Sequence, residues 1–505
     1  MDGNFRNALP VNAQVGVVGA GTMGAGIAQV AALAGHSVLI YDTREGAAEA
    51  AIKKIIASVE KVAAKGRVTE EQVAQVRGSL RAAPGITELK DCGLVIEAIV
   101  EELEAKRELF CSLEEVVNAD ALLATNTSSI SVTAIAASLR SPERFAGMHF
   151  FNPAPVMPLV EVVSGEATSA GVAERIFATA VNWGKIPVHA KSTPGFIVNR
   201  VARPFYAEAL RVLEEGAADC ATIDAVMREA GGFAMGPFEL MDLIGNDVNF
   251  AVTRSVYEGF NGDPRFEKSE LQRQLVEQGF LGRKSGRGFY GYGEGAPAIL
   301  PSTMDSYPTP TEIRIYEGGF FSDALMLRLK KANLPYTQCA AHVDGRIADA
   351  SGCVVYLTDG RTAATRAGQS GVRNTILVDL ALDAYRATRL AITSADQLSA
   401  AASAAGLLQA AGYAVSRIND IPGMIVFRTV AMLANVAADA VEQGVCSTAD
   451  CDLAMRKGVN YPLGPLEWAE KIGTARVVAA LDNLGEAYGQ ERYRVSPLLR
   501  RKAGI

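Results

Sequence analysis

His149 and Glu161 are the two residues whose types and spacing most directly indicate acid–base chemistry. His149 follows the apolar residues 145–148, where we expect a strand, and Glu161 lies inside the apolar run LVEVV, residues 159–163. A charge in such a run needs a partner or an exposed face. A carboxylate on one imidazole nitrogen fixes the tautomer and leaves the other nitrogen as a base for an alcohol proton. We therefore interpret the two as a catalytic pair, although local sequence alone also allows Glu161 to be an outward-facing edge residue.

The remaining histidines and the cysteines show no comparable pattern. His36 lies in a turn between a helix and a strand, His189 follows a short strand, and His342 lies away from any motif, so we expect structural roles for all three. The seven cysteines are scattered without a CxxC pair. We expect reduced thiols and no metal site.

A second chemical signature is the glycine-rich loop GAGTMG that follows the β-branched segment 14–19. In the pattern G-x-G-x-x-G, the first glycine allows a tight turn, the second lets the backbone approach a pyrophosphate, and the third lets helix and strand pack closely. The start of the helix then offers free N–H groups to the phosphates. We expect the loop to bind a dinucleotide through Gly19, Gly21, Thr22, Met23 and Gly24.

Asp42 strengthens this prediction and identifies the dinucleotide as NAD. It ends the next strand, SVLIYD (37–42), close to the spacing at which an acidic residue binds the ribose hydroxyls. Its carboxylate would also repel the 2′-phosphate of NADP. Arg44 is a minor argument against this choice, since a guanidinium can pair with a phosphate.

The elements that must position these residues alternate between strand and helix in the first part of the chain. We expect strands at 14–19, 37–42, 94–99 and 121–126, and helices at 22–34, 46–65, 69–80 and 102–117. Such alternation predicts a parallel, doubly wound sheet covered on both faces. In these sheets ligands bind at the carboxyl ends of the strands, where His149 is expected.

Beyond the first sheet, the chain repeats itself. The segment PGFIVNR (194–200) returns as PGMIVFR (422–428), and GPFEL (236–240) returns as GPLEW (464–468), both shifted by 228 residues. A constant shift indicates a duplicated helical domain. We expect a Rossmann-like NAD-binding domain, a helical domain, a linker, a degenerate Rossmann-like unit without a glycine loop, and a second helical copy, at residues 1–191, 192–290, 291–310, 311–418 and 419–505.

Bulk properties agree with a multidomain enzyme. A length of 505 residues exceeds one core, and the net charge of −7 argues against a general nucleic-acid binder. No leader-like N-terminus and no apolar segment of about 18 residues is present, so we expect a cytoplasmic protein without a membrane partner.

Taken together, these motifs closely resemble the 3-hydroxyacyl-CoA dehydrogenases. The matching segments span about residues 14–290 and include GAGTMG, TNTSSIS, FAGMHFFNPAPVMPLVEVV, TPGFIVNR, GPFELMDLIG and GRKSGRGFY. The duplicated layout resembles the long bacterial form linked to phenylacetate breakdown, whose members act on 3-hydroxyadipyl-CoA or 3-hydroxybutyryl-CoA. The resemblance implies an NAD-dependent oxidation of an acyl-CoA substrate.

The resemblance also implies roles for individual residues. His149 would be the general base, Glu161 its orienting partner, Ser128 a donor to the substrate oxygen, and Asn199 a residue that holds this arrangement. Cofactor contacts are implied for Glu101, Lys106, Asn152 and Lys284. Without the resemblance, Ser128 and Asn199 would be taken for helix caps.

Coenzyme A recognition is the least defined part of the prediction. Lys53, Lys54, Lys61 and Lys65 lie on the long helix after Asp42. They form either a solvated basic face or a cradle for the CoA phosphates.

The second half of the chain lacks the residue types that indicate catalysis and cofactor binding in the first half. Asn199 corresponds to Phe427, and residues 311–418 offer no glycine loop and no equivalent of the His149–Glu161 pair. We expect a catalytically silent second half. The resemblance implies that its helical copy replaces the partner subunit of shorter, dimeric family members in an internal pseudo-dimer; a homodimer stays open as well.

Two competing functions are weighed against this one. The 6-phosphogluconate-like β-hydroxyacid dehydrogenases share the nucleotide fold but resemble a pattern with a catalytic lysine on the helix that joins the domains, where this chain has Asn199 and Arg200. An NAD-binding structural protein has no chemical need for the four catalytic residue types.

Overall fold

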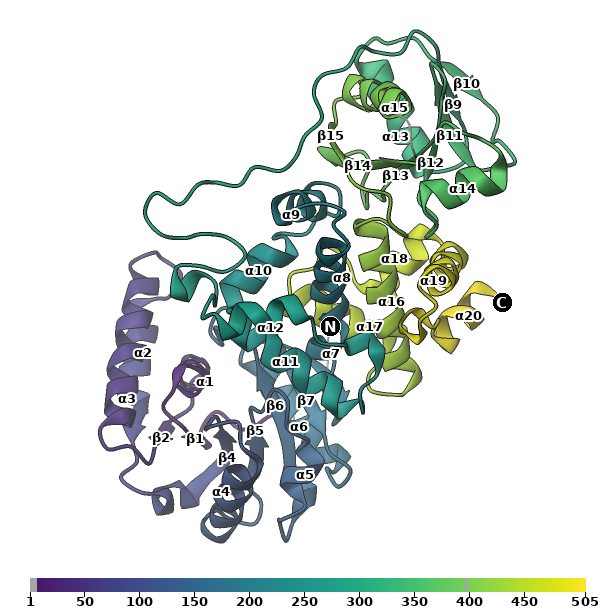
Figure 1. Cartoon of the computed structure of the whole chain (residues 1–505). Helices are drawn as coiled ribbons and strands as arrows, with labels where there is room; N and C mark the ends of the chain where they lie inside the picture. The colour runs from purple at the N-terminus through teal and green to yellow at the C-terminus, as the bar shows by residue number, and fades with distance from the viewer. Residues whose placement is uncertain (1–6, 396–397) are drawn as a thin grey trace. The chain divides into compact units, whose positions relative to one another are not determined.

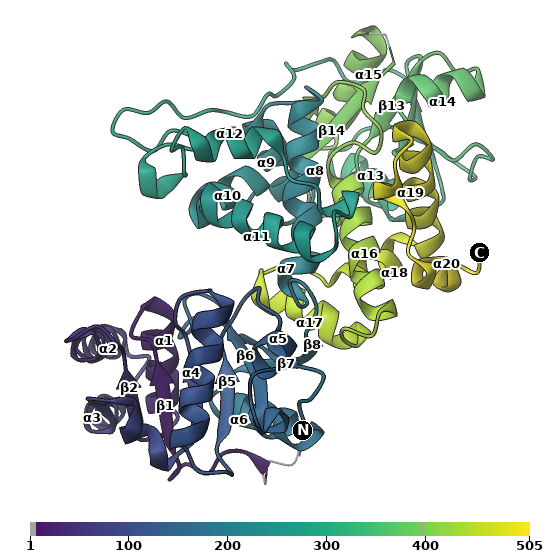
Figure 2. The ribbon, with the colours of Figure 1, turned by 60° about the horizontal axis from the view of Figure 1, so that its bottom comes forward.

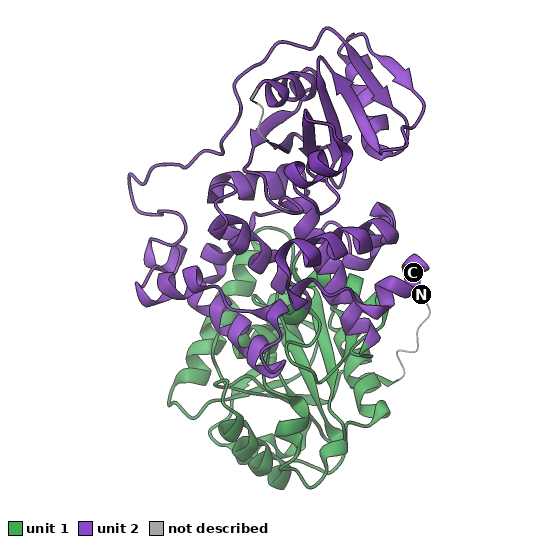
Figure 3. Cartoon of the chain, turned by 45° about the vertical axis from the view of Figure 1, so that its right-hand side comes forward, with its two compact units in different colours: residues 1–200, 443–459 green, residues 201–442, 460–505 purple. Residues whose placement is uncertain are grey.

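The computed structural model describes residues 7–395 and 398–505. The chain forms two compact units (Figure 3), Met1–Arg200 with Gln443–Val459, and Val201–Glu442 with Asn460–Ile505. Among the described residues, no helix is long and apolar enough to cross a membrane. The same residues contain no group of three or more His, Cys, Asp and Glu side chains suited to hold a metal ion.

The first unit is built on an eight-stranded sheet with the order β3-β2-β1-β4-β5-β6-β7-β8 (Figure 1). Its strands are β1 (Gln14–Val18), β2 (Val38–Tyr41), β3 (Leu80–Ala82), β4 (Cys92–Glu97), β5 (Leu122–Thr125), β6 (Phe145–Phe150), β7 (Leu159–Ser164) and β8 (Ile186–Lys191). The sheet is parallel except that β7 runs antiparallel to β6. The expectation of a wholly parallel sheet was wrong at this point, because residues 151–158 form a connection too short for a crossover helix.

Helices pack on both faces of this sheet. The helices of the first unit are α1 (Thr22–Leu33), α2 (Ala47–Ala63), α3 (Glu70–Ser79), α4 (Leu103–Val116), α5 (Val132–Ala136), α6 (Ala170–Asn182), α7 (Val198–Val201, shared with the second unit) and α17 (Thr448–Gly458). The helices expected at 22–34, 46–65, 69–80 and 102–117 are confirmed within three residues at each end. Thr69 caps α3 with a side-chain bond from the Gln72 N–H, as its position predicts.

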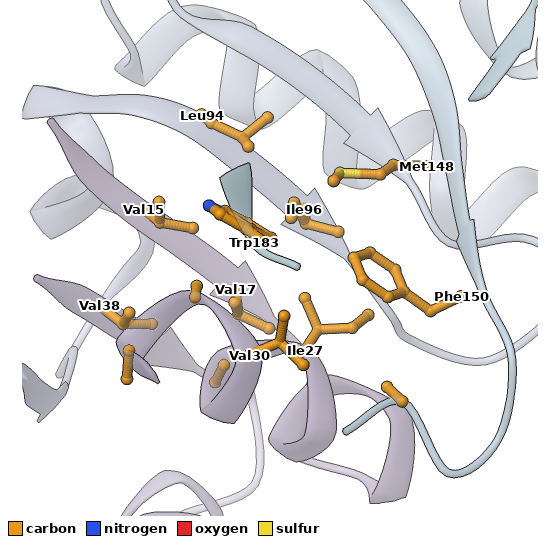
Figure 4. Packing of buried hydrophobic residues seen from close by; sticks show 14 of the residues in the cluster. Val15, Val17, Ile27, Val30, Val38, Leu94, Ile96, Met148, Phe150 and Trp183 are labelled. Carbon is orange, nitrogen blue, oxygen red and sulfur yellow. The ribbon is translucent and has the colours of Figure 1, made fainter. Parts of the chain in front are cut away.

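The core on one face of the sheet holds the glycine-loop helix in place. Ile27 and Val30 of α1 lie against Val17 of β1 and Ile96 of β4, and Trp183 closes the same cluster (Figure 4). All five side chains are at most 7% exposed. This packing fixes the start of α1 at the carboxyl end of β1, which is where a dinucleotide-binding helix must begin.

The second unit contains two sets of helices (Figure 2). The first set is α8 (Arg203–Glu214), α9 (Cys220–Glu229), α10 (Pro237–Ile244), α11 (Asn246–Gly259) and α12 (Glu270–Glu277). The second is α16 (Val426–Glu442), α18 (Pro465–Ile472), α19 (Thr474–Tyr488) and α20 (Pro497–Ala503). Local geometry repeats with the sequence: Gly236 and Gly464 precede α10 and α18, and their backbone N–H groups donate to the carboxylates of Glu239 and Glu467.

A seven-stranded sheet, in the order β10-β9-β11-β12-β13-β14-β15, belongs to the same unit. Its elements are β9 (Ile313–Tyr316), α13 (Phe320–Lys331), β10 (Thr337–Cys339), β11 (Arg346–Ala350), β12 (Cys353–Leu357), α14 (Ala363–Ser370), β13 (Thr375–Val378), β14 (Arg389–Ser394), α15 (Leu398–Ala410) and β15 (Ala414–Arg417). Its last strands pair as β5–β8 do: β12 with β13 parallel, β13 with β14 antiparallel, and β14 with β15 parallel. The sequence also predicts a helix near 396–411, and the first two of these residues lie outside the described part of the chain.

Candidate active site

His149 and Glu161 face each other across the antiparallel pair β6–β7. Their Cα positions are direct partners in the register, and Nδ1 of His149 lies 2.7 Å from Oε2 of Glu161. Glu161 is 0% exposed and His149 5% exposed. The outward-facing alternative for Glu161 is therefore wrong. Since the carboxylate accepts at Nδ1, it favours the tautomer whose Nε2 carries no proton.

The other oxygen of Glu161 binds the start of α7. Oε1 accepts the N–H groups of Ile197 and Val198 at 3.0 and 2.9 Å. Gly195 and Phe196 both have positive φ, so the chain turns sharply into this helix. The next residue, Asn199, donates from Nδ2 to the carbonyl oxygen of Ser128 at 3.2 Å. One carboxylate thus connects the histidine with the helix that carries Asn199.

Ser128 lies in the loop after β5, and Glu101 binds this loop. Oε1 of Glu101 accepts the hydroxyl of Thr127 at 2.6 Å and the N–H groups of Ser128 and Ser129 at 2.8 and 3.1 Å. Burial alone would raise the pKa of Glu101, but Lys106, the Thr127 hydroxyl and the Ser128 N–H lower it to about 2. Glu101 is therefore a carboxylate at neutral pH, and its side chain is 36% exposed.

Glu97 was not among the predicted site residues. It is 0% exposed and accepts a bond of 2.5 Å from the ammonium of Lys106, which lies 3.1 Å from Glu101 on its other side. The signal was the same as for Glu161, a charge within an apolar run, LVIEAI. Lys106 is 1% exposed, and its ammonium binds the carboxylates of Glu97 and Glu101. A direct contact of Lys106 with the cofactor stays a prediction.

The glycine loop has the geometry that a dinucleotide requires. Gly19 has a φ of 103°, and a Cβ there would lie 2.4 Å from the carbonyl oxygen of Ala98. At Gly24 a Cβ would lie 1.8 Å from the carbonyl oxygen of Gly19, whereas Gly21 faces open space. Gly21 caps α1 without a side chain, and α1 begins with Thr22 and Met23. The free N–H groups of its first turn therefore fit a pyrophosphate.

Asp42 lies beside this loop. Its Oδ2 accepts the N–H of Ala20 at 2.7 Å, and its Oδ1 accepts Nε of Arg44 at 3.0 Å. The Arg44 guanidinium holds the pKa of Asp42 down at about 2. The guanidinium of Arg44 is thus paired with the carboxylate of Asp42, although the Arg44 side chain is 72% exposed.

A cavity of about 540 Å³ opens next to the glycine loop, within the size range of small-molecule pockets. Gly21, Thr22, Arg44, Lys54 and Ser58 are among its lining residues. Of the four lysines for which a solvated face and a coenzyme A cradle were both open, Lys54 lines this cavity. Lys53, Lys61 and Lys65 are exposed, and the choice between a solvated face and a cradle stays open for them.

Asn152 and Lys284 complete the predicted set. Asn152 follows β6 and is exposed. Lys284 belongs to the second unit, where its Nζ pairs with Asp247 at 2.6 Å. Cofactor contacts of both residues stay predictions. His189, which we expected after a strand, instead lies inside β8, with Nε2 at 3.4 Å from Glu174.

Comparison with known proteins decides the family. The model of the 3-hydroxyacyl-CoA dehydrogenase NAD-binding domain matches residues 14–193, and that of the C-terminal domain matches both 195–292 and 423–504. A 3-hydroxyadipyl-CoA dehydrogenase from Escherichia coli is 45% identical, over 98% of each chain. The chain belongs to the 3-hydroxyacyl-CoA dehydrogenase family. The predicted resemblance is confirmed, and NAD is the cofactor of this domain type.

Solved structures agree with this assignment. A 3-hydroxybutyryl-CoA dehydrogenase from Escherichia coli superimposes with a TM-score of 0.89 at 44% identity, over 98% of each chain. An (S)-3-hydroxybutyryl-CoA dehydrogenase from Ralstonia eutropha matches with a TM-score of 0.54 at 38% identity, over 56% of this chain and 99% of that one. Residues 355–422 match a reduced Rossmann-fold domain of 3-hydroxybutyryl-CoA dehydrogenases, so the predicted fold class is confirmed.

The reduced domain retains the positions of the His149–Glu161 pair but not its residues. Glu161 pairs with Val188 in β8, and Ser416, the residue 228 positions after Val188, pairs with Ala391 in β14. The N–H of Asp379 donates to the carbonyl of Ala391. Asp379 and Ala391 therefore occupy the positions of His149 and Glu161.

Asp379 nevertheless performs one task of Glu161. It accepts the N–H groups of Ile425 and Val426 at 3.0 and 2.7 Å, the counterparts of Ile197 and Val198. The expected lack of an equivalent holds for the histidine, whose position is taken by Asp379, but a carboxylate again accepts the N–H groups at the start of the following helix.

Proposed function

We propose that this chain oxidises a (3S)-3-hydroxyacyl-CoA to the 3-oxoacyl-CoA with NAD, and that 3-hydroxyadipyl-CoA or 3-hydroxybutyryl-CoA is the substrate. The observation that carries the proposal is the buried His149–Glu161 pair beside the Ser128 loop. The two substrates are those in the names of the similar Escherichia coli proteins.

In this mechanism His149 removes the proton of the 3-hydroxyl group with Nε2. Glu161, bound to Nδ1, stabilises the imidazolium that forms. Ser128 donates to the substrate oxygen, and Asn199 holds the loop of Ser128 against α7. When bound, NAD supplies the hydride acceptor. In the reverse direction His149 returns the proton.

The residues assigned to the cofactor follow from the glycine loop and its neighbours. Gly19, Gly21, Thr22, Met23 and Gly24 would hold the pyrophosphate at the start of α1. Asp42 would accept bonds from the adenosine ribose, and Glu101 would face the other half of the cofactor. Asn152 and Lys284 are assigned on family position alone, and Lys54 would meet a CoA phosphate from the cavity wall.

The two helical copies of one chain would replace the two subunits of a dimer. Counterparts separated by 228 positions meet in the second unit: the rings of Phe233 and Tyr461 lie 5.1 Å apart, and Arg492 donates to the carbonyl of Pro264. Arg428, 0% exposed, binds Glu215, and its counterpart Arg200 binds Gln443, the counterpart of Glu215. Reciprocal contacts of this kind define an isologous interface.

A disulfide test distinguishes this pseudo-dimer from pairing between chains. The double variant Phe233→Cys/Tyr461→Cys should oxidise to a product with the mass of one chain on a non-reducing gel. A product with the mass of two chains would contradict the internal pairing.

The proposed reaction itself is tested by the absorbance of NADH formed from purified protein, NAD and either thioester. We expect turnover of at least one thioester and none of free 3-hydroxybutyrate. If NAD binds but neither thioester is oxidised, the dehydrogenase proposal fails and an NAD-binding structural protein replaces it. Oxidation of the free acid instead would favour the 6-phosphogluconate-like β-hydroxyacid dehydrogenases.

A further inference from the structure

A fully buried carboxylate, Glu97, lies where the loops after β4 and β5 meet. It ends β4 directly opposite Thr125, which ends β5. Its Oε1 accepts the N–H of Ile99 at 2.7 Å, and its Oε2 accepts the hydroxyl of Thr125 at 2.6 Å. One loop leads to Glu101 and the other to Ser128, so Glu97 binds the base of both.

Lys106 connects this buried carboxylate with the site. Its ammonium lies 2.5 Å from Glu97 and 3.1 Å from Oε2 of Glu101. The opposite oxygen of Glu101 accepts bonds from Thr127, Ser128 and Ser129. The contacts run from Glu97 through Lys106 and Glu101 to the loop of Ser128.

The charges along this path explain why Glu97 matters to Glu101. Lys106 is 1% exposed, and water cannot solvate its ammonium. With both carboxylates present, the ammonium is shared between them and Glu101 remains free to bind the serine loop with Oε1. Without the charge of Glu97, the ammonium would draw Glu101 inward, away from the loop.

We propose that Glu97 is a positioning residue that sets Glu101 and the Ser128 loop for cofactor binding through Lys106. The proposal rests on the proposed function in one respect, the assignment of Glu101 to the cofactor. Glu97 touches neither substrate nor cofactor in this account. Its hydrogen bonds join the bases of two loops, one that leads to Glu101 and one that leads to Ser128.

The test is a double-mutant cycle on NAD affinity, measured by calorimetry on the full chain without thioester. The variants are Glu97→Gln, Lys106→Met and the double variant. Glu114→Gln is the matched control, because Glu114 is a buried carboxylate of the same sheet domain that accepts the N–H groups of Arg140 and Ser141. Thermal unfolding of each variant is recorded alongside.

Glu97→Gln should weaken NAD binding by about tenfold or more, as expected for the loss of a charge-assisted bond, and Glu114→Gln by less than about twofold. In the Lys106→Met background, Glu97→Gln should change the affinity by less than about twofold, because the connection is already broken. Wild-type affinity in Glu97→Gln, or independent effects of the two substitutions, would overturn the proposal.

Two features keep the test decisive. If Glu97→Gln alone does not fold, the comparison of Lys106→Met with the double variant remains, and about tenfold weaker binding in the double variant would contradict action through Lys106. Because binding is measured without thioester, failure of the dehydrogenase activity would leave the cycle unaffected, so the two proposals fail separately.

Discussion

Glu161 binds His149 with one carboxylate oxygen and the first turn of α7 with the other. Oε2 lies 2.7 Å from Nδ1 of the histidine, while Oε1 accepts the N–H groups of Ile197 and Val198. The carboxylate proposed to orient the base therefore also binds the start of the helix that carries Asn199. Substitutions at Glu161 should separate these two tasks.

Glu161→Gln should reduce kcat by about 10²-fold or more, the range of general-base effects, while the protein stays folded. The amide oxygen can still accept the α7 N–H groups, but the amide N–H₂ would donate to Nδ1 and place the proton of the ring on Nε2, where it cannot act as a base. Steady-state kinetics and thermal unfolding measure the two effects.

The matched control is Glu174→Gln, which removes the exposed partner of His189 and should leave kcat unchanged. Equal losses in both variants would contradict the assignment of Glu161.

Gly21→Ala should bind NAD at least about tenfold more weakly while unfolding at the wild-type temperature. A Cβ at Gly21 meets nothing within 4 Å in the protein, so the only expected cost is the space taken from the pyrophosphate. Calorimetry and thermal unfolding check this.

Gly78→Ala in α3 is the control, because a Cβ there also meets nothing within 4 Å. It should lower neither the affinity for NAD nor the unfolding temperature. Wild-type NAD affinity in Gly21→Ala would contradict the assignment of the glycine loop to the cofactor site.

Asp42→Ala should lower the preference for NAD over NADP, measured as the ratio of kcat/KM values, by about 10²-fold. The substitution removes the carboxylate that repels a 2′-phosphate and frees Arg44, now bonded to Asp42, to pair with that phosphate. Asp120→Ala, in an exposed turn, is the control. An unchanged ratio would show that the cofactor preference is set elsewhere.

The affinity for NAD should vary by less than about twofold between about pH 5 and 8. The pKa values of Asp42 and Glu101 are lowered to about 2, from 3.8 and 4.5. Because a lowered pKa keeps a carboxyl ionised, both groups are fully charged above their ordinary pKa values. Their contribution to NAD binding is lost only as the pH falls toward 2. Calorimetric titrations across this range would contradict the assignment if affinity decreased steadily toward pH 5.

The sequence alone predicted the fold class and the pairing of His149 with Glu161, because local patterns indicate both. The glycine loop and the strand before it specify the start of α1, and the apolar run around Glu161 marks a buried charge. The antiparallel pairing of β7 with β6 places Glu161 opposite His149. This pairing depends on which strands become neighbours in the sheet, and a local sequence pattern does not specify the neighbours.

The sequence did not reveal the roles of two buried carboxylates, Glu97 and Asp379. Glu97 has the same signal as Glu161, yet its importance depends on Lys106, whose burial follows from the packing of α4 and not from its own neighbours in the chain. Asp379 was missed because the carboxylate that caps the helix comes from the position of the histidine instead of the glutamate.

The most direct test of the central claim compares His149→Ala with His189→Ala in the oxidation of the preferred thioester by NAD. Both histidines have a glutamate partner, Glu161 and Glu174, but only the first pair belongs to the proposed site. We expect kcat of His149→Ala to fall by about 10²-fold or more with unchanged NAD affinity, and His189→Ala to keep wild-type activity. Wild-type turnover by His149→Ala would contradict the proposed mechanism.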